Sequence, residues 1–140
     1  MKEFSATTNI AASPETIWQL LTDASSYPEW DPGMVRLEGT VAPGQKITAY
    51  TKLSPDRAFP VTVTNFVPNQ TMTWTGGMPL GLFKGERTFM LAPQADGTTQ
   101  FTTREQFSGL LLPIIGRTIP DLSESFQNFA QGLKKRAENS

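Results

Sequence analysis

The chain has 140 residues, of which 38% are hydrophobic and 18% charged, and its 12 lysines and arginines nearly balance its 13 acidic residues. This length supports one folded domain, residues 1–140, with a sizeable core, and the composition excludes a disordered chain. The near-zero net charge excludes a general electrostatic attraction to nucleic acid, so we expect no nucleic-acid partner.

The sequence contains neither cysteine nor histidine. Disulfides, thiolate nucleophiles, histidine-based catalytic triads and cysteine or histidine metal sites are therefore excluded. A hard cation could still bind to carboxylates alone, but no dense acidic loop of that kind is present. We therefore expect no metal and no cofactor.

The sequence has no signal for export or membrane insertion. Residues 1–5 lack the apolar run of a signal peptide, and the most apolar stretch, residues 110–115, is far shorter than the roughly 20 residues of a bilayer span. A cytoplasmic location is the default expectation.

A strand and a helix are predicted at the N-terminal end of the chain. Residues 3–11 alternate loosely between apolar and polar side chains, which favours a strand. Ser13 followed by Pro14 and Glu15 predicts a helix start, because serine caps helix N-termini, proline fits the first position and an acid suits the first turn. The apolar residues that would form the buried side of this helix are Ile17, Trp18, Leu20 and Leu21.

A turn or second short helix is expected over residues 23–27, closed by Pro28 and Pro32. The strands predicted after it are residues 34–40, 46–53, 61–66, 71–75, 83–91 and 98–107. The turn signals between them are Pro43-Gly44, Ser54-Pro55-Asp56, Pro68-Asn69, the 76–81 loop and the 94–97 turn. The last two strands form the clearest hairpin in the chain.

A long amphipathic helix is predicted at the C-terminal end. Its apolar stripe would consist of Ile119, Leu122, Phe126, Phe129, Leu133 and Ala137. Thr118 and Asp121 resemble a capping box at its start. The basic residues 134–136 fall near its end, where cations complement the helix dipole, and this favours a structural role over a phosphate-binding patch. A curved antiparallel sheet crossed by one long helix can enclose a pocket.

Alternation along the last hairpin places an arginine and a glutamate among aromatic residues. If Leu91 pairs with Thr99, then Arg87 faces Thr103 and Glu105 lies diagonal to Arg87. The other residues on this face are Phe83, Gly85, Phe89, Phe101 and Phe107. A buried charge needs a partner, so the two residues form either a structural ion pair or an anchor for the polar end of a ligand. A one-residue slip in register would turn both outward.

Met72 and Trp74 share a face that we expect to lie opposite Val61 and Val63. A tryptophan in such a place is more often simple core, although tryptophan beside an adaptable methionine also suits a ligand wall. Tyr50 is either a polar group within the pocket or a solvent-facing side chain. The pattern leaves both alternatives open.

The loop of residues 109–116 is apolar, although loops between elements usually meet water. It could close over a cavity as a gate, or make a dimer contact or a shallow membrane contact. Alternatively, part of it begins the last helix and packs on the sheet. We expect a monomer or homodimer, with Leu110–Ile115 as a transient membrane or protein contact.

Two parts of the sequence resemble a known superfamily. The segments at residues 13–23 and 27–32 resemble the start of the SRPBCC superfamily, which includes START lipid-transfer domains, polyketide cyclase/dehydrase-like proteins and pollen allergens. The segments at residues 85–91 and 97–109 are similar to its penultimate hairpin. Many relatives carry histidine where this chain has Arg87, and arginine cannot act as a general base at ordinary pH.

The resemblance implies an α+β helix-grip fold. In that fold a seven-stranded curved antiparallel sheet surrounds a long C-terminal helix, two short helices lie near the N-terminus, and a deep apolar cavity separates sheet from helix. The strand count from pattern agrees when residues 3–11 are included.

We favour the binding or transport of a hydrophobic small molecule, such as a lipid, isoprenoid or polyketide, in that internal cavity. The expected ligand-binding residues are Met72, Trp74, Phe83, Arg87, Phe89, Phe101, Thr103, Glu105, Phe107, Leu122, Phe126 and Phe129. Apolar burial alone, at about 25 cal/mol per Å², would supply useful affinity.

Two other functions are compatible with the sequence. The chain could be a polyketide cyclase/dehydratase-like enzyme with Glu105 as general base, Arg87 stabilising an enolate and Tyr50 donating a proton. Arg87 is expected to lower the pKa of Glu105, which counts against a catalytic base. The remaining alternative is a protein-interaction module that uses the apolar 109–120 loop.

Overall fold

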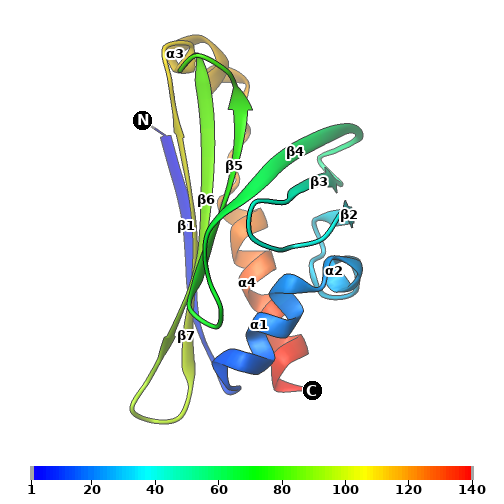
Figure 1. Cartoon of the computed structure of the whole chain (residues 1–140), viewed down its shortest axis with the longest axis vertical. Coiled ribbons are helices and arrows are strands. Elements are labelled where there is room, and N and C mark those ends of the chain that lie inside the picture. The colour runs from blue at the N-terminus through cyan, green and yellow to red at the C-terminus, as the bar shows by residue number, and fades with distance from the viewer. Residues whose placement is uncertain (1, 140) are drawn as a thin grey trace.

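The computed structural model describes residues 2–139 and has the predicted α+β helix-grip architecture. Seven antiparallel strands form one curved sheet in the order β1-β7-β6-β5-β4-β3-β2, and the long helix α4 packs across it (Figure 1). The strands are β1 Lys2–Ile10, β2 Met34–Glu38, β3 Lys46–Thr51, β4 Ser54–Val67, β5 Thr71–Met78, β6 Phe83–Pro93 and β7 Thr99–Ser108.

The helices lie at the two ends of the chain. They are α1 Pro14–Thr22, η1 Ala24–Ser26, α2 Tyr27–Trp30, α3 Leu112–Ile115, η2 Gly116–Thr118 and α4 Ser123–Glu138, where η marks a 3-10 turn. Among residues 2–139, no helix has the length and apolar character needed to cross a membrane.

Helix α1 starts where the sequence predicts it. The hydroxyl of Ser13 accepts a hydrogen bond from the Thr16 amide at 3.2 Å, and Pro14 occupies the first turn. The second helical segment is confirmed as well. Pro28, however, lies inside α2 instead of ending it, because proline is compatible with the first turn of a helix.

Two of the predicted turns are strand instead. Ser54-Pro55-Asp56 belongs to β4, and the chain reverses one step earlier, since Thr51 pairs with Ser54. Pro55 is tolerated because this half of β4 is paired on one side alone, as on an edge strand. Similarly, Gly76, Gly77 and Met78 extend β5, although they were predicted as loop.

The sheet divides into two wings between β4 and β5. These strands pair from Val67 opposite Thr71 to Thr62 opposite Thr75. Beyond that point, β4 continues with β3 alone and β5 with β6 alone, and Figure 1 shows the two strands diverging. A Cβ atom at Gly76 would lie 2.8 Å from the carbonyl oxygen of Pro60, so glycine permits the close approach at the vertex.

The last helix starts later than predicted. Helix α4 begins at Ser123, and the Thr118 hydroxyl donates to the carbonyl of Ile115 instead of capping α4. Asp121 accepts from the Ser123 amide at 3.0 Å. The reason is Pro120, because a residue that precedes proline is driven out of the helical region, and Ile119 is extended. The apolar 109–116 loop forms the separate helix α3 and does not begin α4.

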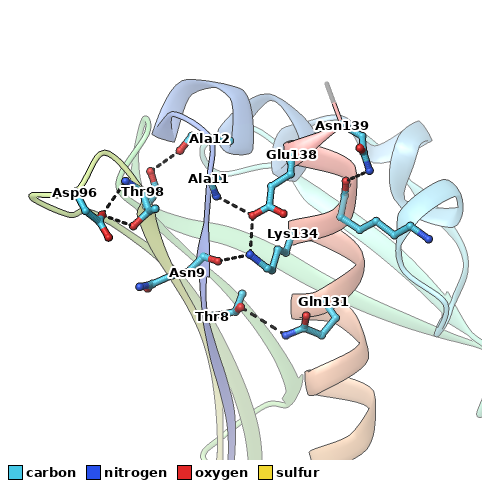
Figure 2. A network of polar contacts seen from close by, with 12 residues as sticks. Thr8, Asn9, Ala11, Ala12, Asp96, Thr98, Gln131, Lys134, Glu138 and Asn139 are labelled. Atoms are coloured by element: carbon cyan, nitrogen blue, oxygen red, sulfur yellow. Dashed lines mark hydrogen bonds and ion pairs between the residues drawn. The ribbon is translucent and has the colours of Figure 1, made fainter.

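Helix α4 is held on both of its sides. A Cβ atom at Gly132 would overlap the carbonyl oxygen of Trp30, so α4 and α2 approach at a position that only glycine permits. On the other side, Lys134 Nζ donates to the carbonyl of Asn9 at 2.8 Å, and Glu138 accepts from the Ala11 amide at 2.9 Å (Figure 2). The C-terminal half of α4 is therefore tied to β1 by its polar side chains.

Candidate ligand-binding site

The β6–β7 register places Arg87 directly opposite Glu105. The predicted register is wrong by two residues, since Leu91 pairs with Phe101 and not with Thr99. A shift of two leaves each side chain on its original face of the strand. Arg87 therefore still points toward α4, and it faces Glu105 squarely instead of diagonally.

Arg87 lies among aromatic rings. Its guanidinium carbon is 4.3 Å from the ring centre of Phe126, 4.5 Å from that of Phe129 and 5.0 Å from that of Phe89. These distances are typical of cation–π contacts. Its Nε donates to the Thr103 hydroxyl at 3.0 Å.

The far end of the guanidinium is not satisfied. Arg87 Nη2 is buried and has no hydrogen-bond partner within the described structure, and no ion pair joins Arg87 to a carboxylate among residues 2–139. Burial lowers the pKa of Arg87, and the negative charge of Glu105 opposes part of that shift. The site therefore contains a cationic donor without an acceptor.

Burial raises the pKa of Glu105 above its ordinary value, while the charge of Arg87 offsets part of the rise. Arg87 thus lowers this pKa as expected, but desolvation outweighs the attraction, so the net shift is upward. Glu105 extends toward Gly85, where a Cβ atom would lie 3.3 Å from its Oε2.

Trp74 supplies a second donor without an acceptor. It pairs with Arg87 across β5 and β6, and its buried Nε1 has no hydrogen-bond partner in the described structure. Its ring packs 4.7 Å from that of Phe89. Val63 lies opposite Trp74 as predicted, whereas Val61 lies beyond the end of the β4–β5 pairing. Two unsatisfied nitrogens thus belong to paired residues of adjacent strands.

Tyr27 and Asp31 are interior polar groups that the sequence did not identify. The fully buried Tyr27 donates its hydroxyl to the Leu21 carbonyl at 2.5 Å, and Asp31 accepts from the Gly33 amide at 3.0 Å. Burial raises the pKa of Asp31, and the Gly33 hydrogen bond and the charge of Arg87 oppose the rise. A helix of four residues has too little periodicity to reveal which side is buried.

Most of the expected ligand-binding residues gather between the sheet and α4. The fully buried ones are Met72, Phe89, Phe101 and Thr103, while Phe126 and Phe129 face them from α4. Phe83 stacks on Phe107 at 5.8 Å toward the α3 end, and Leu122 is partly buried against the core.

Tyr50 does not join this group. It lies opposite Arg36, whose guanidinium carbon is 3.7 Å from the Tyr50 ring centre. The neighbouring pair, Leu37 and Ala49, faces the core, so Tyr50 and Arg36 are on the outer face of the sheet. The structure thus separates Tyr50 from Arg87.

Aromatic side chains occupy the interior beside Arg87. The ring of Phe129 is 5.0 Å from that of Trp30, 5.8 Å from that of Phe89 and 6.0 Å from that of Phe101. A hollow of about 400 Å³ lies between α2 and α4, and one of about 430 Å³ lies where β4 and β5 diverge. Neither hollow is lined by Arg87, Trp74 or Glu105. A ligand that binds beside Arg87 would compete with the contacts among these rings.

The described residues hold no cluster of three or more acidic side chains that could bind a metal ion. The polar groups of the interior are two unsatisfied donors, the hydroxyls of Thr103 and Tyr27, and two carboxyl groups with raised pKa values. This set can bind an oxygen acceptor or move a proton.

Solved structures with the same fold are known from several bacteria. A START superfamily protein from Mycobacterium smegmatis is 21% identical, with 98% of this chain and 97% of that chain covered and a TM-score of 0.74. A hypothetical protein from Helicobacter pylori is 13% identical, covering 97% and 88% of the two chains, with a TM-score of 0.78. The Aha1 protein from Colwellia psychrerythraea, solved as a dimer, is 21% identical over 99% and 97%, with a TM-score of 0.73.

These identities establish a shared fold, and no curated protein matches the chain. The family described as "Polyketide cyclase / dehydrase and lipid transport" matches residues 1–138, which is nearly the whole chain. That match agrees with the helix-grip architecture. The chain belongs to the polyketide cyclase/dehydrase and lipid transport family.

Proposed function

We propose that this protein binds a hydrophobic small molecule between the sheet and α4, with an oxygen acceptor of the ligand held by Arg87 and Trp74. The observation that carries the proposal is the pair of buried, unsatisfied nitrogens, Arg87 Nη2 and Trp74 Nε1. A buried donor left without an acceptor costs about 1–3 kcal/mol. One ligand oxygen between the paired residues would remove both penalties.

The charge of the site favours a carboxylate over a neutral oxygen. Arginine remains protonated at ordinary pH, and no ion pair within residues 2–139 compensates Arg87. A ligand carboxylate would supply that compensation through charge-assisted hydrogen bonds. The ligand classes that combine such a group with an apolar body are fatty acids, isoprenoid acids and polyketide acids.

The apolar body of the ligand would replace ring–ring contacts of Phe89, Phe126 and Phe129 with its own. A ligand that buries roughly 300 Å² of apolar surface gains on the order of 7 kcal/mol before the losses of association are subtracted. Since the rings must first move, the observed affinity would be lower than this figure implies.

Native mass spectrometry of gently purified protein is the first test, because a retained apolar adduct names the ligand class. Oleate titration then probes the anchor. We expect Arg87→Met to weaken oleate binding at least about tenfold, as loss of a charge-assisted hydrogen bond predicts. Arg36→Met is the matched control, since Arg36 also covers an aromatic ring but on the outer face. An equal loss of oleate affinity in both variants would contradict the proposal. A wild-type protein that retains no adduct and binds no oleate would also contradict it.

A second candidate function is proton transfer on a bound ketone. The raised pKa of Glu105, opposite the cationic Arg87, supports it, since a base with a raised pKa and a nearby enolate-stabilising cation suit aldol chemistry. Turnover of a poly-ketone substrate should then fall sharply in Glu105→Gln. Unchanged turnover would leave Glu105 as a structural group.

A further inference from the structure

Two loops form a single apolar surface at the α3 end of the molecule. The turn between β5 and β6 lies beside the segment that follows β7, as Figure 1 shows. The Leu110 amide donates to the Gly81 carbonyl at 3.1 Å, and the Leu111 amide donates to the Leu82 carbonyl at 2.8 Å. We call residues 78–82 and 109–115 together the apolar tip.

The large side chains of the apolar tip are unusually exposed. The exposed fractions are 91% for Leu80, 79% for Leu110, 69% for Ile114 and 47% for Met78. Met78 also lines the hollow where β4 and β5 diverge, whereas Leu80, Leu110 and Ile114 line neither hollow. A continuous exposed apolar surface of this kind marks a site of interaction.

Leu80 gives the strongest indication. Its φ of +62° lies in the left-handed region, which is unfavourable for a residue with a side chain. Glycine would relieve that strain, and a polar residue would suit the exposure, so neither the backbone nor the core accounts for leucine here. The folding of this domain therefore gives no reason for a leucine at this position.

The charges at the margin of the tip are mainly positive. Residues 78–82 and 109–115 contain no charged side chain. Arg117 follows the tip directly, and Lys2 Nζ donates to the Gly116 carbonyl at 3.2 Å. Lys84 is a third cation, and its Nζ forms an ion pair with Glu86 Oε1 at 3.5 Å. Asp121 is the first acidic residue after Arg117.

We propose that the apolar tip inserts into the surface of a bilayer that contains anionic phospholipid. Leucine and isoleucine side chains enter the interfacial region, while Arg117 and Lys2 stay at the level of the headgroups. A fluid surface needs no complementary pocket, which suits exposed side chains such as Leu80, Leu110 and Ile114 that line neither hollow. A second copy of the chain fits less well, because tip-to-tip contact would bring the cations of both copies together.

The tip is also connected to the proposed ligand site by a line of aromatic rings. Phe83 stacks on Phe107 at 5.8 Å, and Phe4 lies 6.3 Å from Phe107 and 6.2 Å from Phe126. Arg87 covers Phe126. If the proposed function holds, docking at the tip delivers an apolar ligand to the near end of this line. The docking itself does not depend on that function.

Vesicle flotation tests the proposal, with vesicles of phosphatidylcholine containing about 30% phosphatidylglycerol. We expect the wild-type protein to bind them and to bind pure phosphatidylcholine vesicles more weakly. The double variant Leu80→Asn with Leu110→Asn should bind about tenfold more weakly, since it removes the two most exposed apolar side chains. Leu53→Asn is the matched control, because Leu53 is 62% exposed in a different turn and should leave binding unchanged.

The alternatives give different results. Absence of vesicle binding by the wild type, or an equal loss in Leu53→Asn, overturns membrane docking. Concentration-dependent dimerisation that is lost in the double variant overturns it as well, in favour of a second copy. Oleate titration of the double variant in solution separates the two proposals. Oleate binding without vesicle binding contradicts only the proposal of bilayer docking. Vesicle binding without oleate binding contradicts only the proposed ligand site.

Discussion

Trp74 and Arg87 face each other across β5 and β6, and each buries a nitrogen that has no acceptor within the described structure. Their aromatic neighbours, Phe89 and Phe129, offer only ring faces, which are weak acceptors without lone pairs. Because an unsatisfied buried donor costs free energy, we expect the pair to lower the stability of the protein.

Trp74→Phe tests that expectation, and the same substitution at a second tryptophan, Trp30, provides the comparison. The substitution removes an unsatisfied N–H, so the gain should offset most of the lost packing, and the free energy of unfolding should change by less than about 1 kcal/mol. Trp30→Phe is the control, because Trp30 Nε1 donates to the Ser26 hydroxyl at 3.1 Å, and the loss there should be about 2 kcal/mol. Urea unfolding measures both. A larger loss at Trp74 than at Trp30 would contradict the assignment.

Glu105 should make the stability depend on pH. Its pKa is raised in the folded state, so between the unfolded and folded pKa values the folded protein binds more protons, and its stability falls as the pH rises. Glu105→Gln removes this contribution. The unfolding free energy of the variant minus that of the wild type should therefore be larger at about pH 8 than at about pH 4.

Glu86→Gln is the control for that measurement, since Glu86 adjoins Arg87 on β6, opposite Gln106 of β7, and pairs with Lys84 near the surface. The comparison of variant with wild type at each pH also removes the effect of Asp31, whose pKa is raised in the same direction. A difference that stays constant with pH would mean that Glu105 is not desolvated.

Gly132→Ala should destabilise the protein although alanine is the better helix former. A Cβ atom would overlap the Trp30 carbonyl oxygen, so α4 or α2 must shift. We expect a loss of at least about 2 kcal/mol, which exceeds the gain of about 1 kcal/mol in helix propensity. Gly116→Ala is the control, because its Cβ would meet only the Leu112 side chain at 3.4 Å. Thermal unfolding that ranks the two variants in the opposite order would refute the close α2–α4 contact.

Ser13→Ala should lower the stability by about 1 kcal/mol, through the loss of the hydrogen bond from the Thr16 amide. Ser25→Ala provides the comparison. The Ser25 hydroxyl donates to the exposed Asp23 carboxylate and caps no helix, so its loss should be nearly neutral. Chemical unfolding of both variants distinguishes a helix cap from an ordinary surface hydroxyl.

The sequence predicted the inward face of Arg87 and Glu105 but not their pairing. Side chains along a strand repeat every two residues, so a register shift of two leaves the pattern of faces unchanged. The turn decides between such registers. Here the Gln94 amide donates to the Thr98 carbonyl, and the first pair beyond the turn is Pro93 with Thr99.

The differences between prediction and structure near the two ends of the chain have other causes. Ile119 and Leu122 continue the apolar period of α4 without being helical, because Pro120 interrupts the backbone while the spacing of side chains is preserved. The burial of Tyr27 and Asp31 depends on how α2 docks against α4, and no local pattern records that contact. The strands and the long helix were thus predictable from periodicity and the helix-grip fold from the family resemblance, whereas the polar site depended on tertiary packing.

The divergence of β4 and β5 makes the sheet itself a candidate aperture. Past the Thr62–Thr75 pair, each strand hydrogen-bonds only to its outer neighbour among the described strands. Widening the gap there breaks no backbone hydrogen bond, in contrast to lifting α4, which would break the ties of Lys134 and Glu138 to β1. Backbone pairing therefore constrains the sheet least at this gap, which begins next to the Gly76–Pro60 contact.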